Sequence, residues 1–167
     1  MKKCLLLLSF ALVTTIASAQ LKVGPGLTLT PDIGITGKIQ KDITDKIDGS
    51  VNLTYFFGNT VEAFGVKSTT STILVEVNGQ YNLDVSDDFI VYPLAGLGLI
   101  ITSAKTTGAG AGFDGSSSAS DIVLNLGGGI NYPLSSFDLF AEAKILIGGA
   151  SNFYLQAGAL FPLGGAN

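Results

Sequence analysis

The most regular feature of this chain is the alternation of apolar and polar side chains along residues 71–85. The apolar parity is interrupted only by Gly79 and comprises Ile73, Val75, Val77, Tyr81 and Leu83. The opposite parity is polar except at Leu74, and its polar members are Glu76, Asn78, Gln80 and Asn82. A period of two places successive side chains on opposite faces of a β-strand. The pattern therefore predicts a strand with one apolar and one polar face.

The same alternation recurs along most of the chain. It predicts strands over residues 21–30, 33–42, 51–57, 71–85, 88–101, 121–132, 137–147 and 152–163. The first range is the weakest, because Gly24-Pro25-Gly26 interrupts it. With it the count is eight, and without it seven. Because single-chain bacterial barrels use even strand numbers, we favour eight.

The connections between these ranges differ in length. Residues 44–46, 86–87 and 134–136 form short turns, as expected on the periplasmic side of a barrel, whereas residues 58–70 and 102–120 are long enough for outer loops. The two remaining outer connections, near residues 31–32 and 149–151, are short. This order indicates an up-and-down arrangement with two long loops outside the cell.

The composition favours a membrane barrel over a soluble β-sandwich. Hydrophobic residues make up 47% of the chain and charged residues 13%, and the non-apolar parity is largely Gly, Asn and Gln. These residue types suit a crowded barrel interior better than the wet face of a sandwich. The predicted fold class is all-β, an eight-stranded antiparallel up-and-down transmembrane β-barrel. Aromatic residues that occur near strand ends, as in membrane girdles, are Tyr55, Phe57, Phe89, Tyr132, Phe137, Phe153 and Phe161.

The N-terminal segment is typical of an export signal. Lys2 and Lys3 precede an apolar run over residues 5–13, and Ala17-Ser18-Ala19 matches an A-x-A cleavage site. The run is about half of the ~20 residues that a membrane helix needs. We therefore expect cleavage between Ala19 and Gln20, with residues 1–19 as signal peptide and residues 20–167 as one barrel domain. The single cysteine, Cys4, would be removed with the signal.

The polar parity of the predicted strands defines the candidate site. An eight-stranded barrel is only wide enough for side chains to fill it, so we interpret this set as a hydrogen-bonded plug in which Lys38 or Lys144 pairs with Glu76 or Glu142. The rival interpretation is a narrow polar channel. The candidate lumen residues are Lys38, Glu76, Asn78, Gln80, Asn125, Glu142, Lys144 and Gln156, with Gln40, Asn52, Thr54, Asn82 and Asn131 on the same parity.

Three stretches resemble small outer-membrane β-barrel proteins of Gram-negative bacteria. They are Val91-Tyr92-Pro93-Leu94-Ala95-Gly96-Leu97-Gly98-Leu99, Leu126-Gly127-Gly128-Gly129-Ile130-Asn131-Tyr132 and Phe140-Ala141-Glu142-Ala143-Lys144. The resemblance covers residues 30–163 and implies an eight-stranded fold of the OmpA/OmpX type. Such chains usually end on an aromatic residue that the insertion machinery recognises. This chain ends in Asn167, and we take Phe161 as the displaced terminal aromatic.

Several kinds of chemistry find little support in the sequence. The chain has no histidine, which removes Ser-His-Asp catalysis and the usual histidine metal sites. Residues 110–115 match G-x-G-x-x-G but lie in a Gly/Ser-rich segment without a helical pattern, so we interpret them as a loop. Asp114 and Asp121 lack the dense spacing of a calcium loop. We expect no catalytic, metal or cofactor residues and no cofactor.

The function that the sequence favours is a non-enzymatic outer-membrane barrel with loops for adhesion, binding or envelope integrity. Its expected partners are the lipid bilayer, the insertion machinery and an unidentified extracellular molecule. Nucleic acid is not expected, because the mature chain has seven lysines, no arginine and 13 acidic residues, a net charge of −6. The alternatives are a narrow channel for small solutes, a lipid-modifying enzyme, and a soluble lipocalin-like carrier whose polar parity would face water.

Overall fold

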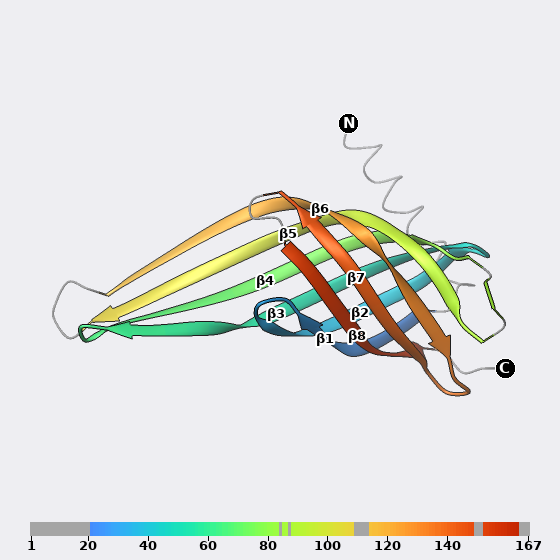
Figure 1. Ribbon diagram of the computed structural model, residues 1–167, viewed down its shortest axis with the longest axis horizontal. Coiled ribbons are helices and arrows are strands. Elements are labelled where there is room, and N and C mark those ends of the chain that lie inside the picture. Colours follow the sequence, from blue (N-terminus) through green and yellow to red (C-terminus); the bar gives the residue numbers. More distant parts are fainter. Residues whose placement is uncertain (1–20, 84, 87, 109–113, 149–151, 164–167) are drawn as a thin grey trace, which may run out of the picture.

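Eight antiparallel strands close into one barrel in the computed structural model (Figure 1). The structure describes residues 21–83, 85–86, 88–108, 114–148 and 152–163, so the predicted signal peptide, with its cleavage site at Ala19 and Gln20, lies outside the described residues. Within the described ranges there is no helix that is long and apolar enough to cross a membrane. The strands are β1 (Leu21–Leu29), β2 (Ile33–Thr44), β3 (Ile47–Ala63), β4 (Val66–Tyr81), β5 (Ile90–Gly108), β6 (Gly115–Pro133), β7 (Asp138–Ile147) and β8 (Asn152–Leu163).

The ring closes between the first and last strands. Each strand pairs with the next one along the chain, and β1 pairs with β8 from Leu21 opposite Leu163 to Leu29 opposite Leu155. The uncertain first strand is therefore part of the barrel, and the seven-strand count is wrong. Closure leaves no open edge around the barrel itself, because every strand there has two hydrogen-bonded neighbours.

The two parities of each strand separate as predicted. Inward side chains are mostly polar and buried, and outward side chains are mostly apolar and exposed. Six residues on the apolar parity of their strands are all outward; Val75 is half-buried, and Val77, Leu97, Leu124, Ile145 and Leu155 are exposed. This arrangement is the reverse of the one expected for a lipocalin-like carrier with an apolar lumen, so that alternative is wrong.

The predicted terminal aromatics point outward near the two ends of the barrel. At the end that holds the short turns, the ring centroids of Phe137 and Phe161 lie 5.5 Å apart. At the opposite end, those of Tyr55 and Phe57 lie 5.8 Å apart. Between these two bands the outer surface is almost entirely aliphatic. We call this surface the outer belt; its exposed members include Ile35, Leu53, Val77, Leu97, Leu126 and Ile145.

The prediction of two long loops at residues 58–70 and 102–120 is wrong. Strands β3 and β4 continue to Ala63 and Val66, and β5 and β6 continue to Gly108 and Gly115. Figure 1 shows that these four strands reach well beyond the ends of β1, β2, β7 and β8. A period-two pattern marks a strand only where one face is apolar, whereas both faces are polar here. The Thr and Ser residues still pair across strands.

We call this four-stranded projection the extension; it comprises residues 58–71 of β3 and β4 and residues 102–120 of β5 and β6, excluding the undescribed residues 109–113. Phe64 and Gly65 join β3 to β4 and both have positive φ, at 53° and 76°. Positive φ at both central residues is the geometry of a two-residue hairpin turn that matches strand twist. A bulky residue such as Phe64 rarely adopts this conformation, and its side chain is fully exposed.

Neighbouring glycines on opposite faces provide a matched test of the strand orientation. A Cβ added to inward Gly96 would lie 2.1 Å from the carbonyl oxygen of Val77, whereas one on outward Gly79 would meet nothing closer than 3.9 Å. We expect Gly96→Ala to lower the free energy of unfolding by about 1–3 kcal/mol, because the backbone of β4 must shift. Gly79→Ala should leave it unchanged or raise it slightly. Urea unfolding in detergent checks both, and equal effects would contradict the assigned faces.

Candidate functional site

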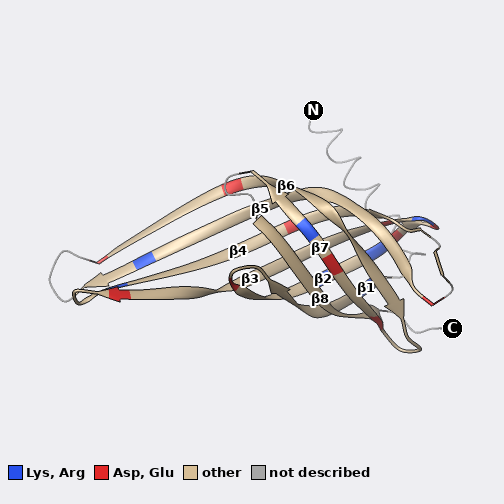
Figure 2. Cartoon of the chain, viewed as in Figure 1, with Lys and Arg blue, Asp and Glu red and all other residues tan. Residues whose placement is uncertain are grey.

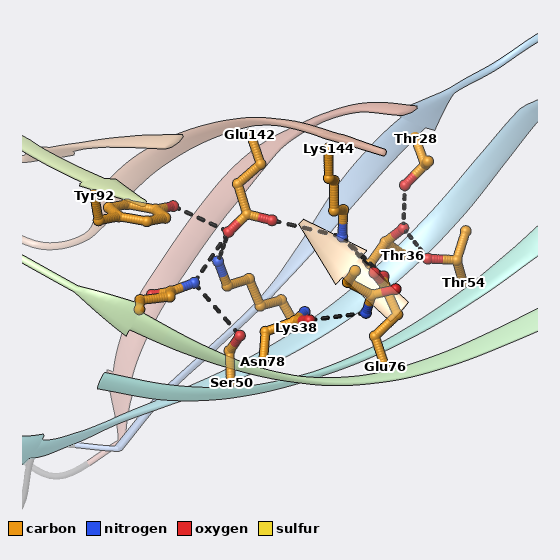
Figure 3. Close-up of polar contacts among 12 residues, drawn as sticks. Thr28, Thr36, Lys38, Ser50, Thr54, Glu76, Asn78, Tyr92, Glu142 and Lys144 are labelled. Atoms are coloured by element: carbon orange, nitrogen blue, oxygen red, sulfur yellow. Dashed lines mark hydrogen bonds and ion pairs between the residues drawn. The ribbon is translucent and has the colours of Figure 1, made fainter. Parts of the chain in front are cut away.

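The eight candidate lumen residues all lie in the interior of the barrel. Each has at most 3% of its surface exposed. They come from five strands around the ring: Lys38 from β2, Glu76, Asn78 and Gln80 from β4, Asn125 from β6, Glu142 and Lys144 from β7, and Gln156 from β8. We call this set, together with the residues that bond to it, the lumen network (Figure 3).

Two ion pairs cross the lumen. The ammonium of Lys144 donates to both carboxylate oxygens of Glu76, at 2.9 and 2.8 Å. Lys38 of β2 donates to Glu142 of β7. Lys144 also lies 3.7 Å from the second oxygen of Glu142, which joins the two pairs. Two ammonium groups and two carboxylates therefore neutralise one another, as burial of charge requires.

Glu142 is the most highly connected group of the network. Besides Lys38, its Oε1 atom accepts from the Tyr92 hydroxyl at 3.0 Å and from the Gln80 amide at 3.1 Å. The Lys38 ammonium also lies 4.5 Å from the centroid of the Phe140 ring, close enough for a cation–π contact. Donors from β2, β4 and β5 thus converge on one carboxylate of β7, which holds four strands of the ring in register (Figure 3).

Inward residues that were not found from the sequence include Tyr92, Asp48, Phe140 and Ser50, which accepts from Gln80 at 3.4 Å. Tyr92 shares the parity of Gly96 and Gly98, so its parity was a signal for an inward position, but its mixed apolar and polar character hid it. Asp48 accepts from Gln40 at 2.8 Å and from Asn82 at 3.0 Å; it lies in the part of β3 that precedes the predicted start at residue 51. Phe140 shares the parity of Glu142 and escaped notice because it is apolar.

An apolar layer lies above the network, toward the extension. Its buried members are Phe56, Leu74, Val123, Leu146 and Tyr154, and half-buried Ile100 packs against them. This layer explains why Leu74 is the one apolar residue on the polar parity of its strand. Because the layer fills the lumen with apolar side chains, it separates the lumen network from the barrel mouth.

The mouth beyond this layer is a small acidic cavity. It has a volume of about 260 Å³, a floor of Phe56 and Tyr154, and the carboxylates of Asp32 and Asp121 in its wall. Asp114, which was considered with Asp121 as a calcium ligand, lies at the far end of the extension, where it accepts from the Gly108 amide at 3.3 Å. The seven-residue separation along β6 places it on the order of 20 Å from Asp121, so the structure does not bring these two acids together.

The G-x-G-x-x-G match at residues 110–115 lies mostly outside the described residues. Its last member, Gly115, begins β6, so a strand follows the motif. A dinucleotide fingerprint needs a helix at that point. Among the residues that the structure describes, no group of three or more acidic, cysteine or histidine side chains is placed to hold a metal ion.

Sequence comparisons assign no family to this chain: no family model matches it, and no curated protein does either. Solved structures resemble its fold. A major outer membrane protein of Thermus thermophilus is 12% identical with a TM-score of 0.73, and the match covers 87% of this chain and all of that one. The N-terminal β-barrel domain of Pseudomonas aeruginosa OprF is 14% identical with a TM-score of 0.65, covering 86% of this chain and 97% of that one.

The attachment invasion locus protein Ail of Yersinia pestis is a third structural match, at 15% identity and a TM-score of 0.57, covering 87% of this chain and 97% of Ail. At these identities the likeness concerns the fold alone. It confirms the fold that the sequence resemblance implied. The chain has the closed, eight-stranded antiparallel fold of small outer-membrane β-barrels.

Proposed function

We propose that this protein is an integral, non-enzymatic protein of the bacterial outer membrane whose barrel anchors the extension outside the cell, where the extension binds another protein. The observation that carries the proposal is the extension itself. It is a four-stranded sheet that leaves the barrel and exposes two polar faces and two open edges.

The outer belt supports a position in the membrane. Only helices and closed barrels satisfy all backbone polar groups inside a bilayer. On β8, Phe153 and Phe161 are eight residues apart, which is about 26 Å along the strand and about 20 Å along the barrel axis at a tilt of ~40°. This height is close to the apolar band of about 25 Å in known outer-membrane barrels. The signal peptide expected to be cleaved at Ala19–Gln20 and the insertion machinery would bring the chain there.

The direction of insertion follows from the turns. Outer-membrane barrels keep short turns on the periplasmic side and longer segments outside. The turns near residues 45–46 and 134–137 lie at the end that also holds the described chain ends, Leu21 and Leu163. The extension lies at the opposite end and would therefore project from the cell.

The open edges of the extension support binding. The β2–β3 pairing ends at Gly34 opposite Phe56, and the β6–β7 pairing begins only at Leu124 opposite Ile147. Along their outer edges, residues 58–63 and 115–123 consequently have backbone N–H and C=O groups that no neighbouring strand of the described chain pairs. Such edges accept an added strand from another protein. Exposed Phe64 at the hairpin tip would supply an apolar contact.

Shortening the extension tests this function. We expect a variant lacking residues 59–69 and 104–117, with short turns in their place, to fold with the heat-modifiable gel mobility of the wild type, because the barrel retains its closure and lumen network. Cells that display it should lose most adhesion to matrix-coated surfaces and to sister cells. Adhesion at the wild-type level by correctly inserted variant would contradict the binding role of the extension.

A non-enzymatic role agrees with the position of the polar groups. The carboxylates of Glu76 and Glu142 neutralise lysines, and they lie beneath the apolar layer rather than in an open cleft. A lipid-modifying reaction would need such groups at the membrane surface.

A narrow channel is the second candidate function. It is favoured by buried amide groups of the lumen, such as both side-chain polar atoms of Asn52 and of Gln156, which have no hydrogen-bond partner within the described chain. Buried groups of this kind usually bind water, and a row of water molecules through the lumen would be the first requirement for conduction. The apolar layer and the two ion pairs oppose it.

A further inference from the structure

The charged residues in the described strands of the extension all lie on its outward face. Lys67 and Lys105 are the only lysines of the extension, and their positions on β4 and β5 share the outward parity of Ile73 and Ile101. Asp121, which follows the extension on β6, has the inward parity and lines the mouth. In the strands of the extension, Glu62, opposite Lys67, is the one acid on the outward parity. Figure 2 shows basic positions in blue on this part of the sheet, and the chain as a whole has a net charge of −4.

The outer face changes from apolar to hydroxyl-bearing at one level. Ile73 lies opposite Ile101, the last apolar pair on this face of β4 and β5. The next outward row consists of Ser71, Ser103 and Ser118, and the row after it of Thr69, Lys105 and Ser116. Neither Lys67 nor Lys105 has an ion-pair partner within 4 Å in the described part of the chain. The outer face therefore offers hydroxyl groups and unpaired ammonium groups together.

These rows surround a depression. It has a volume of about 510 Å³ and is lined by Tyr55, Thr69, Ser71, Ser103, Lys105 and Ser118, among others. Gly58 also lines it and lies at the register shift of β3. A Cβ at Gly58 would lie 1.9 Å from the carbonyl oxygen of Thr70, so the close approach of β3 to β4 at this point requires glycine.

The depression lies at the height of lipid headgroups if the outer belt spans the hydrocarbon core. Lys105 is four residues beyond Ile101, about 13 Å along the strand and about 10 Å along the barrel axis. The headgroup layer adds about 5–7 Å to each side of the hydrocarbon core. A lysine side chain bends back over such a distance to place its ammonium among headgroups. Tyr55, on the membrane side of the depression, is an aromatic of the upper band.

We propose that this depression binds the phosphate group of a lipid headgroup in the outer leaflet. Ammonium and hydroxyl groups are the donors that a phosphate oxyanion accepts from. Lys105 would donate directly, the hydroxyls of the two rows would complete the donor set, and Lys67 would raise the local positive potential. The site would hold the extension at a fixed height above the membrane. This inference rests on the proposed membrane location.

The test uses the full mature chain folded in non-ionic detergent. Dioctanoyl phosphatidate, which carries a phosphate monoester, is titrated against the protein, with dioctanoyl phosphatidylcholine and inorganic phosphate in parallel. Backbone amide chemical shifts report the site of binding. We expect phosphatidate to shift residues 69–71, 103–105 and 116–118, with at least fivefold weaker binding in Lys105→Gln and about twofold weaker binding in Lys67→Gln.

Two further variants sharpen the result. Lys46→Gln removes the same charge at the opposite end of the barrel and should bind phosphatidate like the wild type. Ser103→Ala removes one hydroxyl without changing charge and should weaken binding about twofold. Equal losses in Lys46→Gln and Lys105→Gln would overturn the site, and inorganic phosphate binding as tightly as phosphatidate would overturn the assignment to a lipid.

The membrane location is measured separately, by insertion of the same protein into vesicles. If the protein inserts into vesicles, and the wild type and Lys105→Gln bind phosphatidate equally well, the lipid site alone is refuted. A chain that fails to insert refutes the proposed function and, with it, this inference.

Discussion

Replacing Lys144 by Met is expected to destabilise the folded barrel by about 3–5 kcal/mol, because it leaves the Glu76 carboxylate charged and unpaired in a dry interior. Lys144 makes two short contacts to Glu76, at 2.8 and 2.9 Å, and its contact to Glu142 is longer, at 3.7 Å. The free energy of unfolding in urea, followed by far-ultraviolet circular dichroism in lipid vesicles, measures the loss.

A second substitution, made in the Lys144→Met variant, identifies the carboxylate that pairs with Lys144. Lys144→Met with Glu76→Gln should recover a large part of the loss, since the remaining pair, Lys38 with Glu142, is neutral. Lys144→Met with Glu142→Gln has the same net charge but leaves both Lys38 and Glu76 unpaired, so it should be no more stable than the single variant. Coupling of this kind is expected only between neighbours.

The same variants decide between the plug and the channel. If Lys144→Met leaves stability unchanged and alters ion passage in planar bilayers, water reaches the lumen and the channel is the correct function. If Lys144→Met destabilises the barrel, and neither the wild type nor this variant conducts above background, the network is a structural plug.

Replacing Val77 by Lys is expected to destabilise the barrel folded in a bilayer by about 2–4 kcal/mol. Val77 is 59% exposed at the middle of the outer belt, so a lysine there would place an ammonium in the hydrocarbon far from either interface. Folding into vesicles, followed by gel mobility with and without heating, measures the effect.

Thr69→Lys is the matched control for Val77→Lys. Thr69 lies on the same strand and the same face, but in the extension, where an added lysine meets water or headgroups. It should fold like the wild type. If both lysine variants fold equally well in vesicles, the outer belt does not face lipid, and the proposed membrane location is wrong.

The alternation of residue types was sufficient to predict the barrel, because one face of each strand had to be apolar wherever the other was polar. The predicted bounds of β8 agree with the structure, and those of β2 and β7 differ by one or two residues. The inward parity of Lys38, Glu76 and Lys144 followed from the same pattern. Closure through the weak strand β1 required the even strand number as an additional argument.

Only the tertiary structure decided where the strands end, which groups pair and what fills the lumen. The extension escaped prediction because its two faces are both polar, so no period of two remains to mark a strand. Which glutamate pairs with Lys144 depends on the stagger of strands around the ring. This stagger brings Glu76 of β4 and Lys144 of β7 together across the lumen. The parity of Leu74 placed it inside, but only contacts from five other strands show that it belongs to an apolar layer that seals the lumen network from the mouth.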